Sequence, residues 1–371
     1  RTMELVRSLL PRDLMLSFGN PFEQRLIVNG QNSGLTDFVK RLKLFIVTTS
    51  VLLTICLSSS NAMPESASDQ RSPIPVVVQF DWIFNAQFAG FYQGIEQGFF
   101  LDQGLQLELR GGVTTANTVS ATVEVPGLSI GSTESNVLIA EVAEGADVVA
   151  LGTMFQDSPM GWMYIKGGNI SKFSDLADRR IGIHSDGARV IELLLREAGA
   201  DTSELDTFKA SHDPKPLLDG KLDALQCYYI DEFVKLQKMV GDRAGIFLAR
   251  DHGYKAYSQV MFTERKTALA KSSNLRGFLK AAKLGWAYAF DHPEETIDLI
   301  LEKYNPSLDR DYQLRSLAKI RELMEPEPGS LFRPMSPDLL EDGQSRLLEH
   351  GLISDSISIK DLLSQQFLPH D

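Results

Sequence analysis

The side chains in this sequence best suited to bind a small molecule are those of Trp82, Asn85 and Gln87. They follow a β-branched run at residues 76–78, which predicts a buried strand with these side chains in the segment after it. In an open α/β sheet, ligands bind outside the carboxyl ends of the strands. An indole face stacks on a flat heteroaromatic ring, and amides can read ring nitrogens or an exocyclic amine. The alternative is that Trp82 and Phe84 cap the hydrophobic core.

Two further stretches predict helix starts lined with hydroxyl groups. Ser132 and Thr133 follow a short apolar strand and open a helix, and Ser185 lies in a loop before an amphipathic helix. Free backbone N–H groups at such a start suit an anionic or strongly polar ligand atom. The same hydroxyls would serve equally well as helix N-caps, so ligand contact and capping are alternatives at both places.

A second candidate wall is formed by Tyr228, Tyr229 and Glu232. A carboxyl group can pair with an exocyclic amine and a ring nitrogen of a heteroaromatic ligand, provided that Glu232 faces the ligand. The alternative is that Glu232 is a solvated helix residue. Ser158 and Pro159 fit a hinge better than a ligand contact.

Reactive chemistry has weak support in the sequence. A nucleophile elbow and a phosphate-binding loop are both missing, and the six histidines are scattered without metal-ligand spacing. We therefore expect no catalytic residue, no metal site and no cofactor.

Composition limits the class of protein. The chain has 371 residues, 43% of them hydrophobic, which is enough for two domains. Its formal net charge is −12, and the body of the chain contains no basic run, which argues against nucleic acid as a partner.

The first 74 residues contain an export signal. Basic residues at positions 40–43 precede an apolar run that ends in a small-residue segment at Ala62, which predicts a signal peptide over 39–62 and a periplasmic protein. We expect residues 1–38 to be untranslated or disordered, and residues 63–74 to form a disordered lead-in. Lipid anchoring through Cys56 is an alternative that bulky Ile55 disfavours.

Strand and helix patterns alternate from about residue 76 to residue 263, and helices follow to the C-terminus. The alternation predicts two successive α/β units with mainly parallel strands. The tail predicts helices over 273–290, 293–304, 309–323 and 336–351, which we expect to pack on the first unit.

Several motifs in this order resemble the substrate-binding proteins of ABC importers, and more narrowly those that bind thiamine-pyrimidine precursors. The similar stretches are Asp81-Trp82 with Asn85, Gly90-Phe91-Tyr92, Glu96 to Leu105, Phe155 to Pro159, Asp175-Leu176 before Arg180-Ile181-Gly182, and Gly220 to Glu232. The resemblance covers about residues 76–290.

The resemblance implies an α/β, two-lobed periplasmic binding protein fold of type II with a C-terminal helical extension. The first lobe would comprise 75–165, the second 166–258, and residues 259–371 would return to the first lobe and form the C-terminal helices. The function implied is capture of a small nitrogen-heteroaromatic solute, such as formylaminopyrimidine, between the lobes. The partners implied are an ABC permease and its ATPase, and we expect a monomer.

Other functions are compatible with this resemblance. Related proteins bind alkanesulfonates, taurine-like solutes or riboflavin-like rings, and others present a ligand to a membrane histidine kinase. A further alternative is the related thiamine-pyrimidine synthase, which uses a histidine of its own, pyridoxal phosphate and iron. This chain has Phe88 where that enzyme pattern places the histidine, and it has Cys227 alone where a cysteine-rich stretch is expected. We therefore expect a binding protein and not an enzyme.

Overall fold

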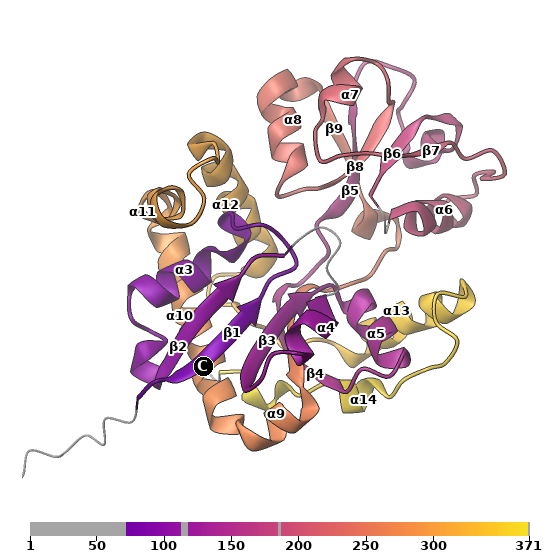
Figure 1. Ribbon diagram of the computed structural model, residues 1–371. Coiled ribbons are helices and arrows are strands. Elements are labelled where there is room, and N and C mark those ends of the chain that lie inside the picture. The colour runs from indigo at the N-terminus through magenta and orange to yellow at the C-terminus, as the bar shows by residue number, and fades with distance from the viewer. Residues whose placement is uncertain (1–71, 113–117, 185–186, 370–371) are drawn as a thin grey trace, which may run out of the picture. The chain divides into compact units, whose positions relative to one another are not determined.

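The computed structural model describes residues 72–112, 118–184 and 187–369 (Figure 1). The predicted signal peptide, the segment before it and most of the lead-in lie outside the described residues, as does Ser185. Within the described ranges, every helix is too short or too polar to cross a membrane. The described chain forms two five-stranded sheets flanked by helices, which we call lobe I and lobe II.

Lobe I is built on a sheet with the strand order β2-β1-β3-β10-β4. The strands are β1 (Ile74–Gln79), β2 (Leu105–Arg110), β3 (Leu128–Thr133), β4 (Val148–Phe155) and β10 (Ser258–Glu264). β1 pairs in parallel with β2 and β3, whereas β10 is antiparallel to both of its neighbours. The mainly parallel order expected for this unit is therefore interrupted by one strand that arrives from the other lobe.

Lobe II has the strand order β7-β6-β8-β5-β9. Its strands are β5 (Met160–Ile165), β6 (Ile181–Ile183), β7 (Thr207–Lys209), β8 (Ala224–Tyr228) and β9 (Ala244–Leu248). Here β5 is antiparallel to β8 and β9, and β6 is parallel to β7 and β8. Each sheet thus contains one strand delivered by a chain crossing between the lobes.

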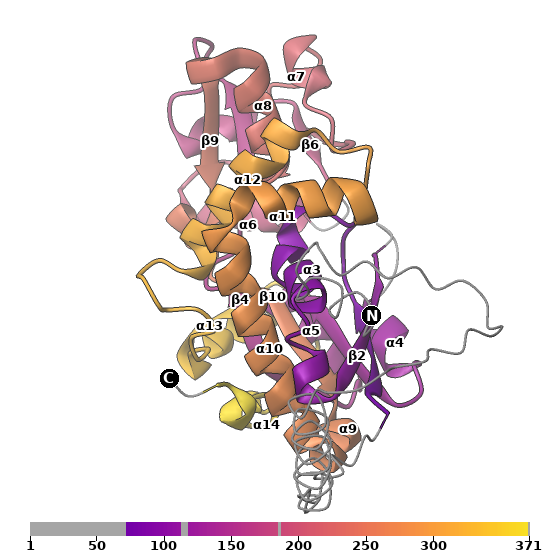
Figure 2. The same ribbon diagram turned by 90° about the vertical axis from the view of Figure 1, so that its left-hand side faces the viewer.

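Helices α3 to α5 and α9 to α14 lie with the sheet of lobe I, and helices α6 to α8 lie with the sheet of lobe II (Figures 1 and 2). They are α3 (Ala89–Glu96), α4 (Thr118–Val123), α5 (Ser135–Ala143), α6 (Gly187–Glu197), α7 (Lys215–Leu218), α8 (Glu232–Val240), α9 (Arg265–Ala270), α10 (Ser272–Asp291), α11 (Pro293–Leu299), α12 (Arg310–Met324), α13 (Pro337–Glu349) and α14 (Ile359–Leu362). Short 3-10 turns occupy η1 (Ala86–Phe88), η2 (Leu101–Gln103), η3 (Phe173–Asp178), η4 (Gly241–Arg243), η5 (Ala249–His252) and η7 (Gln365–Phe367), and η6 (Ile300–Tyr304) is a π-helical turn.

Alternation along β4 shows how the sheet of lobe I is covered on both faces. Val149 and Leu151 join a core that contains α3, α10 and α12, whereas Val148 and Ala150 join a second core that contains α5, α13 and α14. Successive side chains of a strand point to opposite faces, so a strand that is buried along its whole length requires two covering layers. The C-terminal helices supply much of both layers, so the tail packs on the sheet of lobe I.

Three local expectations were wrong. The helix expected to open at Ser132 begins at Ser135, because β3 continues through Thr133. Strand β9 was not predicted, and its Gly245 packs against the ring of Tyr164 on β5. Ser174 in the turn before β6 is a residue type that caps helices and so predicts a cap there, but Asp175 accepts the backbone N–H groups of Ser171 and Lys172 instead.

Candidate functional site

The loop after β1 lies where the sequence placed the first binding wall. Asn85 is the N-cap of η1, and its Oδ1 accepts a hydrogen bond from the Gln87 backbone N–H at 2.9 Å. Both amide side chains are buried, with exposures of 4% and 3%. Phe88 stacks on Phe80 in the core, with ring centroids 3.8 Å apart. The loop is therefore anchored to lobe I, and ligand contacts by Asn85 and Gln87 stay a prediction.

A buried hydrogen-bond chain joins this loop to β3 through β10. Ser132 Oγ donates to Gln259 Oε1 at 2.6 Å, and Gln259 Nε2 donates to both carboxylate oxygens of Asp81 at 3.0 Å. Gln259 is fully buried and has a backbone φ of 58°, a left-handed conformation that costs a non-glycine residue on the order of 1 kcal/mol or more. Such strain persists where surrounding contacts over-determine the backbone, and it concentrates at functional sites.

Asp81 is the first of two carboxyl groups at the site with a raised pKa. Burial raises the pKa of Asp81 to about 6, and the hydrogen bond from Gln259 opposes the rise. Burial also raises the pKa of Asp231, and repulsion by Glu232 adds to the rise, whereas His212 and a hydrogen bond from Trp82 lower it. Since strongly perturbed carboxyl groups gather at functional sites, both residues are candidates that the sequence analysis did not name.

Trp82 of lobe I meets lobe II at His212. Their ring centroids are 4.6 Å apart at an angle of 73°, an edge-to-face contact. His212 in turn lies beside His184, which follows β6, with ring centroids 4.0 Å apart. The backbone N–H of His184 is held by Gln226 Oε1 of β8 at 2.9 Å. Two imidazoles and one indole, from three separate segments, thus lie together at the carboxyl ends of β1 and β6.

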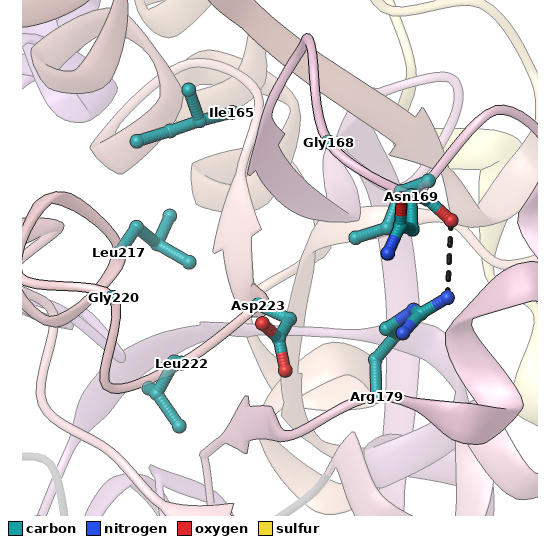
Figure 3. A pocket seen from close by; sticks show the side chains of 9 residues that line it. Ile165, Gly168, Asn169, Arg179, Leu217, Gly220, Leu222 and Asp223 are labelled. Carbon is teal, nitrogen blue, oxygen red and sulfur yellow. Dashed lines mark hydrogen bonds between the residues drawn. The ribbon is translucent and has the colours of Figure 1, made fainter.

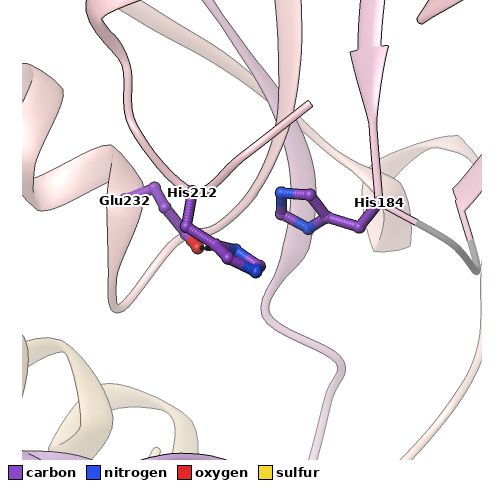
Figure 4. Close-up of side chains that lie close together, drawn as sticks. All are labelled: His184, His212 and Glu232. Atoms are coloured by element: carbon purple, nitrogen blue, oxygen red, sulfur yellow. Dashed lines mark hydrogen bonds and ion pairs between the residues drawn. The ribbon is translucent and has the colours of Figure 1, made fainter. Parts of the chain in front are cut away.

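Glu232 orients this cluster from the start of α8 (Figure 4). Its Oε1 lies 2.7 Å from His212 Nδ1, and its Oε2 accepts the Tyr228 backbone N–H at 2.8 Å. The Glu232 side chain is 6% exposed, whereas that of His212 is 38% exposed. The alternative that Glu232 is a solvated helix residue is therefore wrong, and His212 presents the accessible polar edge of the pair.

Another carboxylate, that of Glu134, connects the two lobes near the chain crossing. It accepts hydrogen bonds from the hydroxyls of Ser158, Tyr228 and Tyr254, at 2.9, 3.1 and 3.3 Å. Glu134 precedes α5 in lobe I, and Tyr228 ends β8 in lobe II. The hinge role expected for the segment of Ser158 stays a prediction.

The remaining predicted residues divide between these places and others. Ser132 and Thr133 are buried strand residues and not helix caps, and the Ser132 hydroxyl is engaged by Gln259. Tyr229 faces α12, where Lys319 Nζ lies 4.0 Å from the centre of its ring. Tyr228 joins the Glu134 contacts through its hydroxyl. The ligand role of all these residues stays a prediction.

His184, His212 and Glu232 are the described residues that could hold a metal ion, since their ligand atoms lie within 4.8 Å of one another. The sequence analysis found no metal-ligand spacing because these residues come from three distant segments. Cys227, the cysteine weighed for iron binding, is fully buried in β8, and burial raises the pKa of its thiol.

A pocket of about 300 Å³ opens elsewhere in lobe II (Figure 3). It is lined by Ile165, Gly168, Asn169, Ile170, Arg179, Leu217, Gly220, Leu222 and Asp223. Arg179 and Asp223 precede β6 and β8, whereas His184 and Tyr228 lie at the carboxyl ends of these strands. The pocket is therefore at the opposite end of the sheet from the histidine cluster.

Comparison with known proteins identifies relatives of the whole described region. The model of the NMT1/THI5-like family matches residues 85–296, more than half of the chain. A formylaminopyrimidine-binding protein of Halalkalibacterium halodurans is 21% identical over 322 residues, which is 85% of this chain and 97% of the relative. A 4-amino-5-hydroxymethyl-2-methylpyrimidine phosphate synthase of Legionella pneumophila is 22% identical, over 61% of this chain and 73% of the relative.

The fold has close parallels among solved structures. The periplasmic aliphatic sulphonate binding protein SsuA from Escherichia coli superposes with a TM-score of 0.62 at 14% identity, covering 80% of this chain and 99% of that one. At this level of identity the likeness defines the fold, a two-lobed periplasmic binding protein, and leaves the ligand to be argued from the site.

Proposed function

The chain belongs to the NMT1/THI5-like family, and we propose that it is the solute-binding component of an ABC importer for a small nitrogen-heteroaromatic solute. The solute class that fits best is an aminopyrimidine of the kind named for the Halalkalibacterium relative, formylaminopyrimidine. The observation that carries the proposal is the contact between Trp82 of lobe I and His212 of lobe II, beside the Glu232 carboxylate.

The roles follow from the exposures and contacts of these side chains. Trp82 offers an aromatic face, which contributes on the order of 1 kcal/mol beyond area burial when it stacks on a planar ring. His212 offers a hydrogen-bonding edge, and Glu232 fixes the orientation of its imidazole. A solute held by both residues would be bound by the two lobes at once, which is how hinged two-lobed proteins couple ligand binding to closure.

The charge of the site favours a neutral or cationic solute. Four carboxyl groups gather here, those of Asp81, Glu134, Asp231 and Glu232. Adding an anion to such a site is costly because each carboxylate repels it at short range. This argues against a sulfonate, and equally against the phosphate of a pyridoxal cofactor, whereas an aminopyrimidine presents N–H groups to the acceptors.

The enzyme alternative finds little support in the residues present. Phe88 stands where the synthase pattern requires a histidine, and it is stacked in the core against Phe80. Cys227 is buried within the sheet of lobe II. We therefore infer a binding protein, exported by the segment 39–62 to the periplasm, which delivers its solute to a membrane permease and its ATPase.

The test is thermal unfolding of the purified full chain with formylaminopyrimidine, hydroxymethylpyrimidine, thiamine, riboflavin, taurine and an alkanesulfonate. A ligand that binds only the native state stabilises it by about 2.7 kcal/mol at a hundredfold excess over Kd. We expect a rise in Tm with a pyrimidine. A rise with the sulfonates alone would contradict the proposed solute class, and so would a panel without any rise.

Variants then locate the site by titration calorimetry. Trp82→Ala should raise the Kd of the pyrimidine by about 5- to 30-fold, the equivalent of roughly 1 to 2 kcal/mol. His212→Ala should weaken binding to a similar extent. Tyr288→Phe is the control, because the Tyr288 hydroxyl donates to Glu295 outside the candidate site, and it should leave Kd unchanged.

A further inference from the structure

The histidine cluster has a geometry that solute recognition does not require. His184 approaches from the end of β6, His212 from the segment after β7, and Glu232 from the first turn of α8 (Figure 4). One ligand atom from each lies within 4.8 Å of the other two. Three different elements thus aim nitrogen and carboxylate oxygen donors at one point.

The donor set is specific for a class of cation. Two imidazoles and one carboxylate are the protein ligands of zinc sites that keep an open position and of non-haem iron(II) sites. Alkaline-earth cations prefer oxygen ligands, so the two nitrogens select a first-row transition metal.

The supporting contacts match those of built metal sites. Outer hydrogen bonds commonly fix the ligating groups of such sites. Here the Tyr228 backbone N–H holds Glu232 Oε2, which leaves Oε1 turned toward His212. The Gln226 side chain holds the backbone N–H of His184. The carboxylate is also buried, which makes it an anion that a bound cation would stabilise.

The distances require a modest rearrangement. Metal–ligand bonds of about 2.0 to 2.2 Å place tetrahedral ligand atoms roughly 3.4 Å apart. His212 Nδ1 and Glu232 Oε1 are already 2.7 Å apart, and the widest separation in the cluster is within 4.8 Å. Bringing the three ligand atoms to metal-binding distances requires rotation of the imidazoles about their side-chain bonds. The proton between Nδ1 and Oε1 leaves to solvent as the metal takes its place.

We propose that His184, His212 and Glu232 form a three-ligand site for a first-row divalent transition metal, with Zn²⁺ and Fe²⁺ as the best matches. The site keeps at least one coordination position open. It lies on the lobe II side of the Trp82 contact, so the metal and the proposed solute would be neighbours. The metal site shares His212 and Glu232 with the proposed solute site, but its three ligands all belong to lobe II and metal binding can be measured without solute.

The experiment is calorimetric titration of the full chain with Zn²⁺ after treatment with chelator, repeated with Fe²⁺ under anaerobic conditions. Substitution with Co²⁺ gives a second readout, since its visible absorption reports the number and geometry of the ligands. We expect the wild-type chain to bind one equivalent of metal. The variants His184→Ala, His212→Ala and Glu232→Gln should bind the metal more weakly or not at all. Mutation of outer partners alone commonly weakens metal binding 10- to 100-fold, so removal of a ligand should cost at least about tenfold.

The controls separate a specific site from other causes of lost binding. His292→Ala removes an exposed histidine outside the cluster and should leave metal affinity unchanged. The Tm of each variant without metal shows whether it folds, and Glu232→Gln keeps an acceptor for the Tyr228 N–H. Absence of saturable binding by the wild-type chain, or binding that all three variants retain, would overturn the proposal. The pyrimidine titration performed in chelator tests the proposed function separately.

Discussion

At the scale of single residues, the site is a set of polar groups whose ordinary properties are altered by burial. Gln259 shows this most clearly, because its amide donates to Asp81 and accepts from Ser132 while its backbone is held at positive φ. The Asp81 carboxylate accepts a hydrogen bond from Gln259, which lowers its pKa. The pKa of Asp81 is still raised, because the loss of solvent on burial outweighs this hydrogen bond.

The raised pKa of Asp81 predicts a pH dependence of stability. Its pKa is about 6 in the folded chain and 3.8 in the reference state, so the folded state binds more protons between these values. Stability contributed by this group is therefore greatest below about pH 4 and falls as pH rises to about 6. Asp81→Asn, which does not titrate, should remove that part of the slope.

The measurement is chemical unfolding of both proteins from pH 4 to pH 7. The difference in free energy of unfolding, wild type minus variant, should decrease as pH rises and level off above about pH 6. Asp175→Asn is a useful contrast, because backbone hydrogen bonds lower the pKa of that carboxyl and its contribution has the opposite sign. A wild-type minus Asp81→Asn difference that is constant with pH would contradict the raised pKa.

At the scale of elements, the first loop is positioned by the close packing of α3 on α10. The two helices approach through glycines on both sides. A Cβ on Gly285 would lie 2.1 Å from the Gly90 carbonyl oxygen, and one on Gly90 would lie 2.3 Å from Cγ of Trp286. The Trp82 loop continues directly into η1 and α3, so the packing of α3 on α10 helps to position this loop.

Gly285→Ala should therefore destabilise the protein although alanine favours helix. Overpacking of a fixed backbone contact typically costs about 1 to 3 kcal/mol, more than the gain of about 1 kcal/mol in helix propensity. Gly277→Ala on the same helix is the matched control, because its new Cβ would lie 3.1 Å from Gln103 Cβ, a contact that a shift of a few tenths of an ångström relieves. Urea unfolding should show a clear loss of stability for Gly285→Ala and little or none for Gly277→Ala.

At the scale of the whole molecule, the two lobes are linked by chain crossings and by side-chain contacts. Tyr228 of lobe II donates to Glu134 of lobe I. Lys238 of α8 bonds to Asp309 before α12, and Ser316 of α12 donates to the Ile230 carbonyl oxygen. In the proposed binding protein, such contacts would bias the equilibrium between arrangements of the lobes, to which solute binding would be coupled.

Tyr228→Phe tests this coupling. It removes one hydroxyl from the Glu134 group and leaves the ring and the Tyr228 backbone N–H in place. A hydrogen bond contributes about 1 kcal/mol net, so the apparent Kd of the solute should rise roughly fivefold. Calorimetry gives Kd, and small-angle scattering of the free protein reports any shift between arrangements. An unchanged Kd would contradict a role for this contact in closure.

Local periodicity in the sequence predicts most of the elements and their order, although it missed strand β9. The all-apolar run of β4 and the helices after residue 264 followed directly from the pattern. Even so, the end of β3 was wrong at Ser132 and Thr133. Thr133 pairs with Val260 of β10, and a partner strand that arrives from the other lobe extends the ladder beyond what local propensity indicates.

The site was predicted in part. The loop at Trp82 and the acidic residue at Glu232 were found from the sequence, since each is a polar or aromatic group at an element boundary. His184, His212 and Gln259 were missed, because their meaning depends on partners that are distant along the chain. Gln259 and Asp81 are 178 positions apart, and the fold alone joins them. Tertiary structure thus decided which side chains meet, because a contact across two sheets leaves no periodic signal in the sequence.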